Sequence, residues 1–188
     1  MIGETTMRKN IFAICAVVAL SLALLTIPAK SQQDKSQRPS PPASTQCNLA
    51  GGYVVKIDYS SPRMKGRKIY GDLVPWGQPW RAGANEATTF VTDAELLVGG
   101  KTVPAGSYTI FTVPNQTQWQ LIIHKKTGEW GIPYPGESGE LLRTSMTVSS
   151  LPAPLENFTI GFDEAGGACA LNMDWETTRA SVKISRKM

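Results

Sequence analysis

The chain has 188 residues, of which 41% are hydrophobic and 18% charged, proportions that are typical of one globular domain with short additional segments. The formal net charge is +4, and half of it comes from residues 1–31, which carry three basic residues and one acidic residue. The charge that remains is too small for a nucleic-acid binder, and no basic run alternates with aromatic residues as such a surface requires. We therefore expect no nucleic-acid partner.

The first 31 residues have the pattern of an export signal. Arg8 and Lys9 precede an apolar run over residues 11–27, and small residues then follow at the spacing that signal peptidase accepts. The apolar run of about seventeen residues is at the lower limit for crossing a bilayer, so an uncleaved membrane anchor is the alternative. We expect a signal peptide at residues 1–31, no other membrane contact, and an exported protein that is periplasmic or secreted.

Export changes how the cysteines are interpreted. Cys15 lies inside the predicted signal, which leaves Cys47 and Cys169 near the two ends of the folded region. In an oxidising compartment such a pair favours a disulfide. Closing a loop of about 120 residues would stabilise the fold by roughly 4–5 kcal/mol in the chain-entropy model. Two buried, unpaired thiols are the alternative interpretation.

No sequence feature indicates a metal or a cofactor. His124 is the only histidine, and no metal-ligand spacing surrounds it. Glycine-rich phosphate loops, dinucleotide fingerprints and nucleophile elbows do not occur either. His124 is expected to be a surface or hydrogen-bonded residue rather than a catalyst.

The rest of the chain divides into a linker and one domain. Residues 32–46 are rich in Gln, Ser, Pro and Lys and are predicted to form a disordered linker. From Cys47 onward, alternating segments such as residues 53–59 and 142–148 predict about eight or nine short strands. Gly99-Gly100 is typical of a two-residue hairpin turn.

These strands predict an all-β fold for residues 47–186. With turn signals between short strands and no convincing helix, we expect a single antiparallel β-sandwich or jelly-roll-like domain, and an incomplete β-barrel is the alternative. Residues 108–113 are apolar on both faces, which indicates a central strand. In residues 118–124, Trp119 is expected to face the core.

One long stretch, residues 61–90, is not explained by strand formation. It shows neither alternation nor a helical stripe, and Gly and Pro interrupt it repeatedly. A long connection without regular structure is usually functional or disordered, and its aromatic and aliphatic residues argue against disorder. We expect an ordered loop that packs over the β domain and carries the site.

The residue types in this loop suit small ligands. Arginine binds carboxylate or phosphate groups in bidentate fashion, and Trp76 or Trp80 would stack on a sugar ring. Glu86 is a weak candidate for a general acid or base. The alternative is structural, with Trp side chains in the core and Glu86 paired with Arg81. The candidate ligand-binding residues are Arg63, Lys65, Arg67, Trp80, Arg81, Asn85 and Glu86.

The same loop carries a family resemblance. Residues 60–90, together with residues 103–111, 156–160 and 171–176, closely resemble the motifs of a bacterial family known as domain of unknown function 2911. The resemblance extends over residues 47–185 and implies an exported protein with one β domain. The family has no assigned activity, so the resemblance implies no reaction. The loop positions that match are Ser61, Pro62, Arg63, Lys65, Gly66, Arg67, Trp80, Arg81, Gly83, Asn85, Glu86 and Thr88.

Three hypotheses for function follow. The first is an exported module that binds a small anionic or carbohydrate ligand through the loop. The second is a hydrolase or isomerase of cell-envelope or sugar substrates, with Glu86 as acid or base, Arg81 orienting the substrate, and Asp174 or Glu176 as a second carboxylate. The third is a purely structural envelope protein whose loop completes the core.

Overall fold

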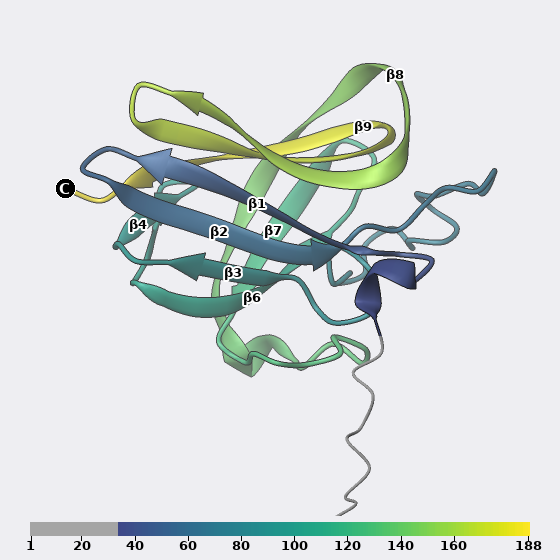
Figure 1. Cartoon of the computed structure of the whole chain (residues 1–188), viewed down its shortest axis with the longest axis horizontal. Coiled ribbons are helices and arrows are strands. Elements are labelled where there is room, and N and C mark those ends of the chain that lie inside the picture. Colours follow the sequence, from purple (N-terminus) through teal and green to yellow (C-terminus); the bar gives the residue numbers. More distant parts are fainter. Residues whose placement is uncertain (1–33) are drawn as a thin grey trace, which may run out of the picture. The chain divides into compact units, whose positions relative to one another are not determined.

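Residues 34–188 are described by a computed structural model, and nearly all of their regular structure is β-strand (Figure 1). Their helices are two short 3₁₀ segments, η1 (Lys35–Gln37) and η2 (Glu137–Gly139). No helix in residues 34–188 has the length and apolar character needed to span a membrane. The predicted signal peptide at residues 1–31 lies outside the described range.

Nine strands form one sheet in the order β1-β2-β3-β6-β7-β8-β9-β4-β5, and every neighbouring pair is antiparallel. The all-β, antiparallel prediction is confirmed, whereas a division into the two sheets of a sandwich or jelly roll is not. The strands are β1 (Pro42–Leu49), β2 (Tyr53–Ser60), β3 (Thr89–Thr92), β4 (Leu96–Val98), β5 (Lys101–Val103), β6 (Gly106–Val113), β7 (Gln118–His124), β8 (Glu140–Ala165) and β9 (Ala168–Arg186).

Local sequence explains the shorter strands and their turn. In β2, Val55 and Ile57 are buried, while Lys56 and Asp58 between them are exposed, as the alternation predicts. Gly99 and Gly100 join β4 to β5 with φ angles of 54° and 80°, a left-handed conformation that glycine adopts without steric cost. The predicted hairpin turn is confirmed.

The strands β8 and β9 are longer than the sequence predicts. Each joins two segments that the alternation indicates as separate strands. The pairing of β8 with β9 shifts register between Ser150 and Leu155 and again between Leu155 and Thr159. Pro152 and Pro154 lie in this irregular part. Proline has no amide proton, and here its absence removes no hydrogen bond between β8 and β9, because these residues are not paired. The backbone therefore stays extended while the pairing is interrupted.

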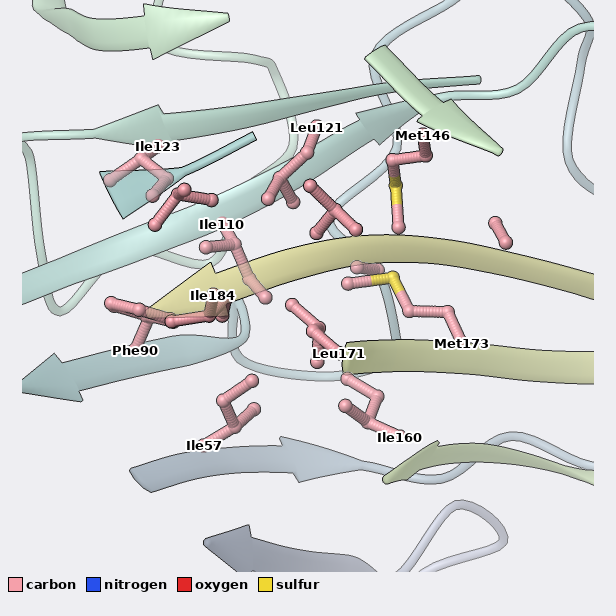
Figure 2. Close-up of a cluster of buried hydrophobic side chains, with 14 of the residues drawn as sticks. Ile57, Phe90, Ile110, Leu121, Ile123, Met146, Ile160, Leu171, Met173 and Ile184 are labelled. Carbon is pink, nitrogen blue, oxygen red and sulfur yellow. The ribbon is translucent and has the colours of Figure 1, made fainter. Parts of the chain in front are cut away.

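The main core lies on one face of the sheet, which bends around it. The labelled side chains in Figure 2 come from β2, β3, β6, β7, β8 and β9 and point into one cluster, and each of them is at most 2% exposed. In Figure 1 the tip of the β8–β9 hairpin lies beside β1, and the Ala50 amide donates to the Gly167 carbonyl at 3.1 Å. Strands far apart in the sheet order thus enclose the same core.

A smaller cluster covers the opposite face of β6 and β7. Ala87, Phe111, Val113 and Ile122 are buried there, and Tyr134 packs against them from the Gly- and Pro-rich segment between β7 and β8. Because both faces of β6 are buried, its prediction as a central strand is confirmed.

Regular structure begins before Cys47. The helix η1 and the first half of β1 lie within residues 32–46, which the sequence predicts as a disordered linker. β1 pairs with β2 along its whole length, from Pro42 opposite Ser60 to Leu49 opposite Tyr53. Before Cys47 the strand has no large apolar residue, so backbone hydrogen bonds define it and the sequence carries no hydrophobic signal for it.

Cys47 and Cys169 join β1 to β9. Both are buried, their sulfurs lie at disulfide-bonding distance, and their Cα atoms are 6.5 Å apart. The Glu164 carboxylate lies within 4.8 Å of both sulfurs. Among residues 34–188, these three side chains are the ones close enough together to hold a metal ion. Glu164 accepts a hydrogen bond from the Asn48 amide at 2.9 Å, and the sulfurs of the group face each other as a disulfide.

We predict that the double substitution Cys47→Ser/Cys169→Ser lowers the free energy of unfolding by about 2–5 kcal/mol, because the bond constrains a long stretch of unfolded chain. Urea unfolding of the non-reduced wild type and of the variant measures the difference. Equal midpoints would contradict the prediction, as would two thiols that react freely with an alkylating reagent in non-reduced protein.

Trp119 faces the core as predicted and is 0% exposed. Its ring lies 4.9 Å from that of Tyr70, centroid to centroid. We predict that Trp119→Ala lowers the free energy of unfolding by about 3–5 kcal/mol, through lost burial and the cavity that remains. Val91→Ala, on the exposed face of β3, is the control and should cost less than about 0.5 kcal/mol. Similar losses in both variants would refute the assignment.

Candidate functional site

The connection between β2 and β3, residues 61–88, is an ordered loop without regular structure, as the sequence predicts. It is attached to β8 where the β8–β9 pairing is interrupted. The Met64 amide donates to the Glu156 carbonyl and the Phe158 amide donates to the Pro62 carbonyl, each at 2.9 Å. The Ser61 hydroxyl also donates to the Phe158 carbonyl, at 2.6 Å. The beginning of the loop therefore acts as a short additional strand.

An aromatic cluster holds the middle of the loop. The Trp80 ring stacks on that of Trp175, with centroids 5.9 Å apart and planes at 17°, and meets the edge of Phe158 at 4.9 Å. The Trp80 backbone exchanges two hydrogen bonds with Thr112 of β6, at 2.7 and 2.8 Å. Trp175 in turn donates from Nε1 to the Glu156 carbonyl at 3.1 Å. Trp80 is thus fixed by contacts from three strands.

A cavity of about 290 Å³ opens beside these two indoles, and we call it the Trp80 cavity. Its walls are mostly apolar, and Leu73 and Ile132 at its edge are 43% and 64% exposed. Exposure of large aliphatic side chains around a concave site is typical of a surface that meets a ligand. The lining residues are Ser40, Pro62, Arg67, Leu73, Val74, Trp80, Arg81, Gly83, Ala84, Ile132 and Trp175.

Two guanidinium groups line the Trp80 cavity. Arg67 donates from Nε to the Met64 carbonyl at 3.0 Å and from Nη2 to the Arg63 carbonyl at 2.6 Å. Arg81 donates from Nη1 to the Trp130 carbonyl at 2.9 Å and lies over the Trp130 ring, 5.3 Å from its centroid. Carbonyl oxygens orient these cations without neutralising them. Burial lowers the pKa of Arg81, and the negative charge of Glu86 opposes that effect.

A second hollow, of about 370 Å³, adjoins the first. It is lined by Pro39, Ser40, Arg63, Lys65 and Arg67, and it shares Ser40 and Arg67 with the Trp80 cavity. Within the described part of the chain, no carboxylate forms an ion pair with any of the basic residues of the two hollows. Glu156 accepts a hydrogen bond from the backbone amide of Lys65 at 2.8 Å and does not form an ion pair with its ammonium group.

Asn85 and Glu86 do not line either hollow. The Asn85 side chain donates to the Ser40 carbonyl at 2.9 Å, and its φ angle of 56° places it in the left-handed region. Glu86 pairs with Lys35 at 3.0 Å and with Arg38 at 2.8 Å, so the alternative of an Arg81–Glu86 ion pair is wrong. Both residues hold the segment before β1 against the loop.

The environment of Glu86 suits a permanent anion. Hydrogen bonds lower the pKa of Glu86 to about 2. The largest contribution comes from its own backbone amide, and smaller ones come from Lys35 and Arg38. A carboxyl group this acidic holds no proton to donate at neutral pH and is a weak base. Of the two candidates for a second carboxylate, Asp174 is engaged by Arg179 through two hydrogen bonds of 2.8 and 2.6 Å, and Glu176 lines neither hollow.

His124 is buried, and its ring is hydrogen-bonded to the backbone. It is 1% exposed at the end of β7, its Nδ1 accepts a hydrogen bond from the Lys126 amide at 3.0 Å, and its Nε2 donates to the Gly136 carbonyl at 3.1 Å. Both ring nitrogens therefore have backbone partners, which agrees with the expectation of a hydrogen-bonded residue.

Several residues of the Trp80 cavity are absent from the sequence-based candidates. Trp175 is identifiable only as a core residue of a strand, and Ile132 and Ser40 lie in Pro-rich segments with no motif of their own. Leu73 and Val74 lie inside the loop but resemble ordinary core residues. Only the folded chain brings residues 40, 132 and 175 to the loop.

The contribution of Glu86 is expected to depend on pH. Its pKa in the folded protein, about 2, is below the ordinary value of 4.5, so the stabilisation is present above about 4.5 and is lost as the pH falls towards 2. We predict that Glu86→Gln lowers stability at neutral pH by about 0–1 kcal/mol, since the side chain is 43% exposed, and that the difference vanishes near pH 2.

Urea unfolding at neutral and at acid pH measures this effect. Glu95→Gln, which removes another exposed glutamate–lysine pair, is the control for loss of a surface charge. A Glu86→Gln deficit that persists unchanged at the acid end would contradict the prediction.

Comparison with known proteins identifies a family and nothing more specific. The family described as "Protein of unknown function (DUF2911)" matches residues 40–184, which include the loop, both linked cysteines and all of the sheet except the last two residues of β9. No curated protein and no solved structure matches the chain. Because the match covers most of the chain, the protein belongs to the DUF2911 family.

Proposed function

We propose that this protein is an exported binding module for a small anionic ligand with an apolar body, and that the ligand binds in the Trp80 cavity. The observation that carries the proposal is a concave site where Arg67 and Arg81 lie beside a stacked pair of indoles and form no ion pair with a carboxylate of residues 34–188. An acidic group of the ligand pairs with the guanidinium groups, and the apolar body of the ligand packs on the partly exposed Trp80 indole and on the aliphatic walls.

The arrangement of the cations supports an anion as the ligand. Arg63, Lys65 and Arg67 line the adjoining hollow, so like charges gather on one side of the loop. Like charges in proximity repel each other and destabilise the unliganded protein, and a bound carboxylate or phosphate relieves that repulsion. A purely structural loop would be expected to pair its charges with other residues of the protein, as Glu86 does with Lys35 and Arg38.

The position of the acidic residues favours binding over hydrolysis or isomerisation. No carboxylate lines the Trp80 cavity, and Glu86 borders a different hollow with Lys35, Asp58 and Tyr59. The low pKa of Glu86 also makes it a poor proton donor at neutral pH. We therefore do not assign a reaction to this site.

Two observations support export. The first 31 residues have the composition of a signal peptide, and the linked pair Cys47–Cys169 is typical of proteins that fold in an oxidising compartment. The proposed location is the periplasm or the extracellular medium.

The test compares two anionic probes with a neutral probe that is isosteric with one of them, phenylacetate. Phenylacetate and phenyl phosphate should raise the melting temperature and bind in calorimetry, whereas the neutral isostere phenylacetamide should bind at least about tenfold more weakly, because charge-assisted hydrogen bonds contribute about 1.5–3 kcal/mol each. Arg67→Gln/Arg81→Gln should remove this preference.

Lys68→Gln/Lys183→Gln is the matched control, since it removes the same charge from exposed positions outside both hollows. It should leave the preference unchanged. The proposal fails if no anionic probe binds, if the neutral isostere binds equally well, or if both double variants lose binding to the same extent.

A further inference from the structure

A different part of the loop forms another concave surface, which is uncharged and separate from the two hollows described above. Trp76 and the turn between β6 and β7 surround a shallow hollow of about 510 Å³, lined by Trp76, Asn115, Gln116, Thr117 and Gln118. We call it the Trp76 hollow. It shares no lining residue with the Trp80 cavity and contains no charged side chain.

Trp76 is fixed in place although it is exposed. Its ring stacks on that of Tyr70, with centroids 5.7 Å apart and planes at 25°, and 36% of the residue remains exposed. Tyr70 is itself held by edge contacts with Trp119 and Trp175, at 4.9 and 6.5 Å. An indole supported in this way loses little conformational entropy when it binds a ligand.

Gly71 leaves the space that this indole occupies. A Cβ atom at Gly71 would clash with Nε1 of Trp76, and the φ angle of 84° is one that glycine adopts without strain. Any larger residue would displace the ring. The Gly77 amide then donates to the Pro114 carbonyl at 2.8 Å, which ties the loop to the turn on the other side of the hollow.

The turn supplies polar groups that have no partner within the described chain. The side chains of Asn115, Gln116, Thr117 and Gln118 form no hydrogen bond with any other residue of the described range, and all four residues are exposed. Together they offer amide donors, amide acceptors and one hydroxyl group around the edge of the indole.

We propose that the Trp76 hollow is a binding site for a neutral oligosaccharide, separate from the anion site. A pyranose ring has an apolar C–H face, which packs on an indole, and hydroxyl groups at its edge, which exchange hydrogen bonds with amides. A shallow, open surface suits one segment of a longer glycan. The lack of charge distinguishes this site from the Trp80 cavity and favours a neutral sugar over an acidic one.

Saturation-transfer NMR with cellotetraose, maltotetraose and the fully N-acetylated chitotetraose tests the proposal. At least one of these neutral oligosaccharides should receive saturation at its ring protons and shift the indole N–H signal of Trp76. Trp76→Ala should weaken binding by roughly tenfold, as expected for loss of an aromatic stacking contact. Gln116→Ala/Gln118→Ala changes only exposed side chains and should weaken binding severalfold with an unchanged melting temperature.

Arg67→Gln/Arg81→Gln should bind the oligosaccharide as the wild type does, and this separates the sugar site from the proposed anion site. Three results would overturn the inference. These are no saturation transfer to any of the three oligosaccharides, binding that Trp76→Ala and Gln116→Ala/Gln118→Ala leave unchanged, or loss of binding only in the arginine variant.

Discussion

The interruption of the β8–β9 pairing between Ser150 and Thr159 is the constraint on which the candidate sites depend. Residues 156–158 of β8 have no pairing partner in β9, and they pair with residues 62–64 of the loop. The Glu156 carbonyl accepts hydrogen bonds from both the Met64 amide and Trp175 Nε1, so one backbone oxygen connects the loop to the aromatic core. Residues 62–64 thus form a short antiparallel pair with β8 next to the position where Glu156 also holds Trp175, and this brings the loop to the aromatic core on which Trp80 stacks.

The two proposed sites are opposite ends of one aromatic array. Trp76 stacks on Tyr70, Tyr70 meets the edge of Trp175, and Trp175 stacks on Trp80. Each ring is held by its neighbours, so the loop needs no helix or strand of its own to stay ordered. What differs between the two ends is the polar residues that surround them. Arginines lie at the Trp80 end and uncharged amides at the Trp76 end, and this difference is the reason for proposing an anion at one and a neutral sugar at the other.

The sequence predicts those features that depend on neighbouring residues. The alternation of Val55 and Ile57, the Gly99-Gly100 turn and the core position of Trp119 follow from local patterns, and the structure confirms them. The ordered loop is also predictable, because aromatic residues in a long connection favour packing over disorder. The pairing of Glu86 with Lys35 and Arg38 is not predictable, since it joins residues 48 or more positions apart in an irregular segment. The joining of Trp175 and Ile132 to the loop depends likewise on tertiary contacts that leave no trace in local sequence.

The contacts between β1 and the tip of the β8–β9 hairpin also bear on how the molecule behaves at high concentration. A sheet edge with free backbone groups can pair with an edge of another molecule and lead to aggregation. On β1 the Asn48 amide donates a hydrogen bond to the Glu164 carboxylate. Just beyond the strand, the Ala50 amide donates to the Gly167 carbonyl. The disulfide from Cys47 to β9 keeps these partners in place. At the other end of the sheet order, β5 has only three residues and begins with an exposed lysine, Lys101. The contacts of Asn48 and Ala50 leave fewer free backbone groups at the end of β1 for pairing with another molecule, and the linked cysteines hold that end beside β9.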